Sequence, residues 1–169
     1  MSFLRSLAPA ALLLLAACGG DPGSGAVEPR WDRTTCERCR MSVSDPRHTA
    51  QVRQPLAGGR SRVVMFDDIG CALLWLDDKL WRDDPRTEIW VTDHRDGRWI
   101  DARRASYVTG NNTPMAYGLG AQDEAVDGAL DFTQARRHIF ETEIRFNTHQ
   151  AHLKEQLLEQ MRAGAATEK

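Results

Sequence analysis

The sequence predicts an α+β fold, with two ββαβ-like units in one compact domain and a C-terminal helical extension over residues 148–169. Three observations support this. Short β-prone runs are separated by turn residues, and an apolar stretch with helical spacing follows the first pair. The order strand, strand, helix, strand occurs in residues 49–92 and again in residues 98–146. A length of 169 residues suits one such domain.

The first unit begins with a hairpin. Residues 49–52 and 63–66 are β-prone and flank a reversal rich in Pro and Gly. Asp67 or Asp68 then stands where a helix N-cap belongs, ahead of apolar residues at helical spacing over about 69–80. The first half of that stretch is apolar nearly all round, so we expect this part of the helix to be buried.

The second unit is predicted from another turn and a change of period. Residues 89–92, which close the first unit, and residues 98–100 flank an Asp-Gly turn, which predicts a second hairpin. A strand is expected over 115–121 and a helix over 123–136. Apolar and charged residues alternate over 140–146, which predicts a half-buried strand.

The N-terminus predicts export and a lipid anchor. Residues 1–17 carry one Arg and then an apolar run too short for a permanent membrane span. The run ends in Leu-Ala-Ala before Cys18, which resembles the bacterial lipobox, whose cysteine is lipidated. A plain secretory signal is the alternative. Residues 18–30 are rich in Gly and predict a flexible tether. The folded domain is therefore expected over 31–147. The anchor would hold it at the periplasmic side of the inner or the outer membrane.

Composition and cysteine number narrow the function. The apolar fraction of 41% and the formal net charge of −2 argue against disorder and against a nucleic-acid-binding surface. If Cys18 carries lipid, three thiols remain, Cys36, Cys39 and Cys71. An odd number is a poor disulfide framework for an exported protein. Either one thiol is simply buried, or some of them do chemistry.

One segment combines soft metal donors. Cys36, Cys39 and Met41 lie within six residues, and thiolate and thioether together favour Cu(I). Zinc sites make little use of methionine. Met115 follows a polar loop that ends in Pro, so it is the candidate for a second thioether. The sequence therefore predicts a Cu(I) site with Cys39, Met41 and Met115 as ligands and Cys36 assisting capture.

Other interpretations of the same residues stay open. The Cys-x-x-Cys pair also fits a structural zinc site, a disulfide, or a redox pair at a helix N-terminus. Cys71 is expected as a packed thiol on the buried helix, and Asp67 and Asp68 as capping residues. Arg38 and Arg40 flank the motif, as thiolate-stabilising charges or as solvated side chains.

The order of the motifs resembles the NosL family, the nitrous oxide reductase accessory lipoproteins. The resemblance covers about residues 11–146 and rests on five features in sequence: the lipobox, Cys-x-x-Cys-x-Met at 36–41, Phe-Asp-Asp-Ile-Gly-Cys at 66–71, Trp-Ile-Asp-Ala at 99–102, and Thr-Pro-Met at 113–115.

The resemblance implies a carrier and not an enzyme. It implies delivery of Cu(I) to the copper centres of nitrous oxide reductase, with a membrane ABC-type maturation complex as docking partner. It also implies two ββαβ-like units, and metal ligation by Cys39, Met41 and Met115. The rivals from other classes are a thiol-based enzyme that uses the Cys-x-x-Cys pair and a structural envelope lipoprotein.

Overall fold

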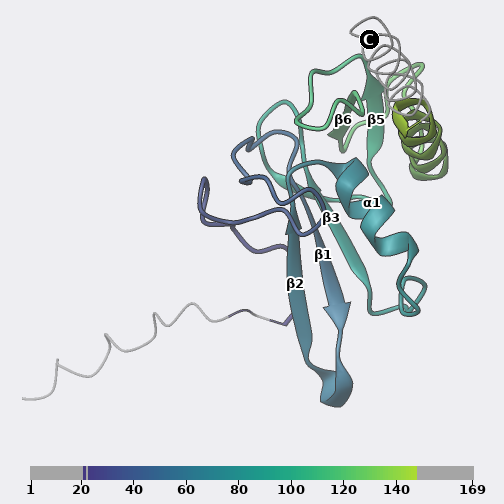
Figure 1. The fold of residues 1–169 in the computed structure, drawn as a ribbon. Helices are drawn as coiled ribbons and strands as arrows, with labels where there is room; N and C mark the ends of the chain where they lie inside the picture. The colour runs from purple at the N-terminus through teal and green to yellow at the C-terminus, as the bar shows by residue number, and fades with distance from the viewer. Residues whose placement is uncertain (1–20, 22, 148–169) are drawn as a thin grey trace, which may run out of the picture.

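A computed structural model of the chain describes residue 21 and residues 23–147. Its main sheet has the strand order β2-β1-β3-β4 with antiparallel neighbours, and a second sheet pairs β5 with β6 (Figure 1). The mixed α+β class is therefore confirmed. The strands are β1 (Ala50–Pro55), β2 (Ser61–Phe66), β3 (Glu88–Thr92), β4 (Trp99–Asp101), β5 (Ser106–Thr109) and β6 (Leu119–Gln122), and a 3-10 turn (Ala57–Gly59) joins β1 to β2.

Helix α1 (Ile69–Asp77) connects β2 to β3 and packs against β1 and β2. Asp68 is its N-cap: the backbone there is extended, and the carboxylate accepts a hydrogen bond from the Gly70 amide at 2.7 Å. Since β1 lies between β2 and β3, the helix crosses over β1 in a split βαβ arrangement. The first predicted unit, strand-strand-helix-strand, is confirmed.

The two faces of β1 are covered differently. Val52 pairs with Val64 and Ile89, and all three are buried in the core. Alternation along the strand turns Gln51 and Arg53 to the opposite face. These two polar side chains are only 1% exposed.

Residues 21 and 23–28, here called the strap, bind to the polar side chains of that opposite face. The Gln51 side chain exchanges two hydrogen bonds with the Val27 backbone, at 2.9 and 3.0 Å. The Arg53 guanidinium donates to the Gly25 carbonyl at 2.8 Å. The strap thus lies within the segment for which the sequence predicted a flexible tether, but it is held against the sheet.

The second half of the chain departs from the predicted repeat. After β4 come β5, β6 and a helix that covers residues 132–147 of the described chain. The predicted helix over 123–136 is therefore wrong except at its end. The predicted strand over 140–146 is also wrong, because these residues are helical.

A missed capping signal explains this correction. The Asp131 carboxylate accepts from the Gln134 amide at 2.8 Å, and the Gln134 side chain accepts from the Asp131 amide at 2.9 Å. This reciprocal pair starts the helix as a capping box does. Ala135, Ile139 and Thr142 then share one buried face at helical spacing. Over the seven residues 140–146 the apolar positions fit both an alternating and a helical spacing, so this short stretch was mistaken for a strand.

Gly70 brings the two halves of the domain into contact. A Cβ at this position would lie 2.2 Å from the ring of Tyr117, so only glycine lets the ring pack on α1. Within residues 21 and 23–147, no helix is long and apolar enough to cross a membrane. The predicted signal, Cys18 and the extension over 148–169 lie outside the described residues.

Candidate metal centre

Four side chains from three separate segments meet beside the N-terminus of α1. One ligand atom from each of Cys36, Cys39, Asp67 and Cys71 lies within 4.8 Å of the others. The cysteine pair belongs to the loop before β1, Asp67 follows β2, and Cys71 is in the first turn of α1. These residues form a group that could hold a metal ion, here called the thiol cluster.

The loop with the Cys-x-x-Cys pair is a tight turn. The Cys36 amide donates to the Met41 carbonyl at 2.8 Å, and the Arg40 amide donates to the Cys36 carbonyl at 3.1 Å. Arg40 adopts a positive φ of 67° to close the turn. The Glu37 amide donates to the Met65 carbonyl at 3.0 Å, which fastens the loop to the end of β2. The pair is therefore not at a helix N-terminus, where a thioredoxin-like redox pair would be.

Burial within the thiol cluster is graded. Cys36 and Cys71 are completely buried and Asp67 is 1% exposed, whereas Cys39 is partly exposed. The Cys39 thiol donates to Oδ2 of Asp67 at 3.1 Å. Among the described residues, Oδ1 of Asp67 is buried without a hydrogen-bond partner. A buried unpaired acceptor is costly, and a bound cation would relieve that cost.

The thiols have unequal acidities. A hydrogen bond with Cys71 lowers the pKa of Cys36 to about 6. Burial, together with Asp67 and Cys36, raises the pKa of Cys39 to about 12. The hydrogen bond with Cys36 and burial raise the pKa of Cys71 as well. All three cysteines are free thiols, and Cys36 is the most acidic of them.

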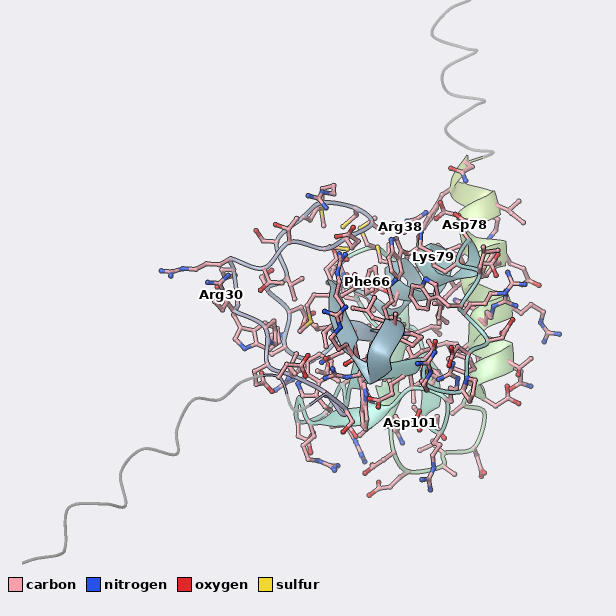
Figure 2. The ribbon with its side chains drawn as sticks, turned by 90° about the horizontal axis from the view of Figure 1, so that it is seen from below. Arg30, Arg38, Phe66, Asp78, Lys79 and Asp101 are labelled. Atoms are coloured by element: carbon pink, nitrogen blue, oxygen red, sulfur yellow. The ribbon has the colours of Figure 1, made fainter. Side chains whose placement is uncertain are left out.

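Arg38 connects the thiol cluster to the C-terminal helix. Its guanidinium donates to Oε1 of Glu143 at 2.6 Å and to the Tyr117 hydroxyl at 3.3 Å, and it also interacts with the Cys71 thiol. The Tyr117 hydroxyl donates to Oε2 of Glu143 at 2.6 Å. The Arg38 side chain is 28% exposed and that of Arg40 is 67% exposed. Figure 2 shows sulfur atoms gathered beside Arg38. Of these two arginines, it is Arg38 that places its charge at the thiols.

The two predicted thioether ligands occupy different positions. Met41 is at the end of the cysteine turn and is 47% exposed. Met115 is half-buried, and its amide donates to Oδ2 of Asp68 at 3.4 Å. Because Asp68 is the N-cap of α1, this bond holds the Met115 loop at the helix end that carries Cys71. The role of both methionines as ligands stays a prediction.

Sequence reasoning missed two members of the thiol cluster. Cys71 was expected to be packed, and it is fully buried, but its sulfur also faces the cysteine pair. The sequence named Asp67 or Asp68 as the helix cap, and the cap is Asp68, which leaves Asp67 for the thiol cluster. The available signal was the spacing Asp-x-x-x-Cys across a strand-to-helix junction, which places both residues at the same end of the sheet.

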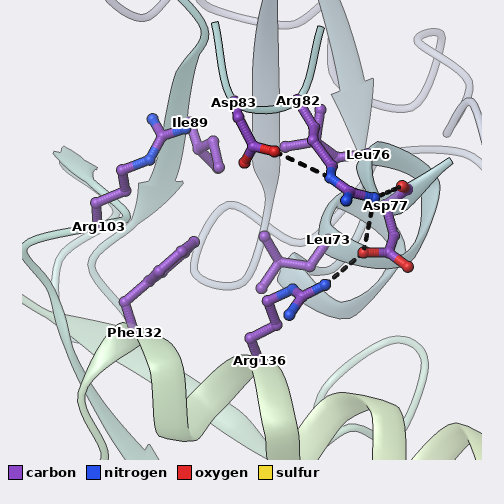
Figure 3. A pocket seen from close by; sticks show the side chains of 9 residues that line it. All are labelled: Leu73, Leu76, Asp77, Arg82, Asp83, Ile89, Arg103, Phe132 and Arg136. Atoms are coloured by element: carbon purple, nitrogen blue, oxygen red, sulfur yellow. Dashed lines mark hydrogen bonds and ion pairs between the residues drawn. The ribbon is translucent and has the colours of Figure 1, made fainter. Parts of the chain in front are cut away.

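A second polar region lies at the other end of α1. It is a cavity of about 290 Å³ between α1, β3 and the C-terminal helix (Figure 3). The residues that line it carry no sulfur and no imidazole, so this cavity offers no soft metal donor. They are Leu73, Leu76, Asp77, Arg82, Asp83, Ile89, Arg103, Phe132 and Arg136.

Comparison with known proteins identifies the family of the chain. The NosL family matches residues 30–125, which is more than half of the chain and includes every member of the thiol cluster. No curated protein and no solved structure matches the chain. On the extent of the family match, the chain belongs to the NosL family.

Proposed function

We propose that this protein is a Cu(I)-binding metallochaperone that supports assembly of the copper centres of nitrous oxide reductase. The observation that carries the proposal is the thiol cluster: three cysteines converge on one point, and one of them is partly exposed. Thiolates are the donors that Cu(I) prefers. A carrier must also release its cargo, and a partner's sulfur can reach the ion from the side of Cys39.

We assign the ligands different parts in holding and releasing copper. Cys36 and Cys71 are buried and retain the ion, and Cys39 at the opening exchanges it. Met41 and Met115 are the outer donors, which replace or supplement Cys39 during transfer. Arg38 partly offsets the negative charge of the thiolates.

Zinc is the second candidate, and Asp67 favours it. Three thiolates and a carboxylate oxygen make up a four-ligand set of the kind that holds structural zinc. Carboxylates contribute little to Cu(I) sites. Asp67→Asn therefore separates the two metals: it should weaken zinc binding at least tenfold and change Cu(I) affinity by less than threefold.

The proposal includes a place in the cell and partners. A lipid on Cys18 would anchor the protein to the periplasmic face of a membrane, and an ABC-type maturation complex would receive the ion. Family membership supports the link to nitrous oxide reductase maturation. Acyl incorporation that is lost in Cys18→Ala tests the anchor, and the copper content of nitrous oxide reductase from cells that lack the protein tests the client.

The central experiment is an anaerobic Cu(I) titration of the protein against a competing chelator. Cys39→Ser should weaken binding at least tenfold, and Met41→Leu and Met115→Leu about threefold each. Met65→Leu is the matched control, because strand alternation turns Met65 away from the face of Val64 and Phe66. If Cys39→Ser and Met41→Leu both leave the affinity within twofold of the parent, the copper proposal is wrong.

A further inference from the structure

The strap is held by side chains from three strands. The Arg53 guanidinium on β1 forms an ion pair with Asp21 at 2.9 Å, in addition to its bonds to the Gly25 carbonyl. Ser61 at the start of β2 donates to the Gly23 carbonyl at 3.0 Å. Glu88 on β3 accepts from the Gly25 amide at 2.8 Å. The chain is therefore held on the sheet at Asp21, Gly23 and Gly25.

The strap has a built binding site on the sheet. Arg53 is almost completely buried, and apart from Ser61 and Glu88 its polar partners belong to the strap. Gly23 and Gly25 have φ of 83° and 77°, values that side chains rarely adopt, so these glycines serve a defined path. The strap also precedes residue 30, where the family match begins.

The strap limits how far the domain can lie from a lipid on Cys18. Three residue steps separate Cys18 from Asp21, and a fully extended chain covers at most about 11 Å over that length. A free tether from residue 18 to residue 30 would cover up to about 43 Å. The domain must therefore lie close to the bilayer and cannot swing freely.

The same contacts choose which end of the sheet lies near the bilayer. Asp21 and Gly23 are held by Arg53 and Ser61, which belong to the half of the β1–β2 hairpin next to its turn. Six residue steps along β2 lead from Ser61 to Asp67, or roughly 20 Å. The turn and the N-terminus of α1 lie at opposite ends of the sheet (Figure 1). The anchor and the thiol cluster are thus separated by the length of β2.

The hairpin turn carries charge that suits a bilayer surface. Arg60 and Arg62 are both exposed at or beside the turn. Residues 50–66 contain no Asp or Glu, although the whole chain has a formal net charge of −2. Basic side chains within a Debye length of anionic headgroups are attracted to them.

We propose that the tip of the β1–β2 hairpin, residues 56–62, binds anionic lipid headgroups beside the acyl anchor and points the thiol cluster away from the membrane. This inference rests on the lipid anchor of the proposed function. It does not rest on copper binding. The strap keeps the hairpin close to the bilayer, and Arg60 and Arg62 are attracted to the anionic headgroups.

Hydrogen exchange of the full-length lipidated protein in vesicles tests this orientation. The vesicles are phosphatidylcholine, with or without 30% phosphatidylglycerol. We expect exchange over residues 56–62 to slow at least fivefold on the anionic vesicles, and exchange in the cysteine turn, residues 36–42, to be unchanged. Arg60→Gln/Arg62→Gln should lose the protection. Arg33→Gln/Arg47→Gln removes the same charge from exposed positions elsewhere and should keep it.

The strap is tested separately with Arg53→Met. This substitution removes the main hydrogen-bond donor to the strap and fills the buried position on β1 with an apolar side chain of similar length. This variant should stay on the vesicles through its lipid but lose most of the protection at 56–62. Equal exchange of the parent protein on both vesicles, or protection at 36–42 instead, would overturn the inference. Failure of the lipid anchor would appear as absence of the protein from both kinds of vesicle. Failure of the copper proposal would appear only in the Cu(I) titration. Both results therefore differ from failure of the orientation, which appears in the exchange pattern.

Discussion

The two ends of α1 both collect charged and polar groups, but among the described residues only the N-terminal end has a buried side-chain oxygen without a hydrogen-bond partner. At the C-terminal end, Asp77 pairs with Arg136 and with Arg82, and these paired groups line part of the pocket in Figure 3. At the N-terminal end, Asp67 keeps a buried oxygen without a partner beside three thiols.

This difference indicates which end is better suited to bind a ligand. Side chains that already form ion pairs with one another gain little free energy when a further ion binds. A buried unpaired acceptor beside polarisable sulfur gains much more when it binds a cation. A pocket lined by groups that already pair with one another can be purely structural. The predictions that follow compare the two ends directly.

The largest expected effect is on copper affinity at the N-terminal end. Cys71→Ser removes a fully buried sulfur from the thiol cluster and should weaken Cu(I) binding about 1,000-fold, or about 4 kcal/mol. Asp77→Asn at the other end should leave the affinity within twofold. Chelator competition measures both. Equal affinities for the two variants would remove Cys71 from the ligand set.

The next largest effect is on stability at the C-terminal end. Leu73 is 3% exposed and contributes to the wall of the pocket. Leu73→Ala should lower the free energy of unfolding by about 3 kcal/mol through the cavity that it leaves. Denaturant titration measures this loss of stability. The Cu(I) affinity of the folded variant should stay within twofold of the parent protein. A tenfold loss of affinity would show that the two ends are coupled.

A smaller effect separates the two arginines of the cysteine turn. Arg38→Gln removes a positive charge beside Cys71 and should weaken Cu(I) binding about tenfold, because a nearby cation favours the thiolate. Arg40→Gln, at an exposed position, should change it less than twofold. Arg38→Lys should restore part of the affinity, which a purely structural role for the guanidinium fork would not allow.

The smallest effect concerns the surface ion pairs at the C-terminal end. Arg82→Gln removes a half-exposed partner of Asp77 and should change the free energy of unfolding by less than about 1 kcal/mol. The cost should shrink further in 0.5 M salt, where exposed charges are screened. A loss above 2 kcal/mol would mean that this network holds the pocket together.

Local patterns were sufficient for the first half of the fold. The hairpin of β1 and β2, the cap at Asp68 and the pairing of β3 with β4 each depend on turn residues, alternation or helical spacing within a short stretch. Local patterns were not sufficient for the second half. The residues from Phe140 to Phe146 fit both the strand and the helix period, and the capping pair of Asp131 and Gln134 that identifies the helix lies outside that stretch.

The sequence by itself determined that soft donors cluster in one short segment, and that the motifs follow the order of the NosL family. Cys36, Cys39 and Met41 are neighbours along the chain, so spacing alone reveals them.

Only the tertiary structure decided the membership of Asp67 and Cys71, the burial of Arg53 under the strap, and the choice between Arg38 and Arg40. These depend on distances between segments that are 28 to 105 residues apart in sequence. No local period encodes such distances, because they are set by how β2, α1 and the C-terminal helix pack together.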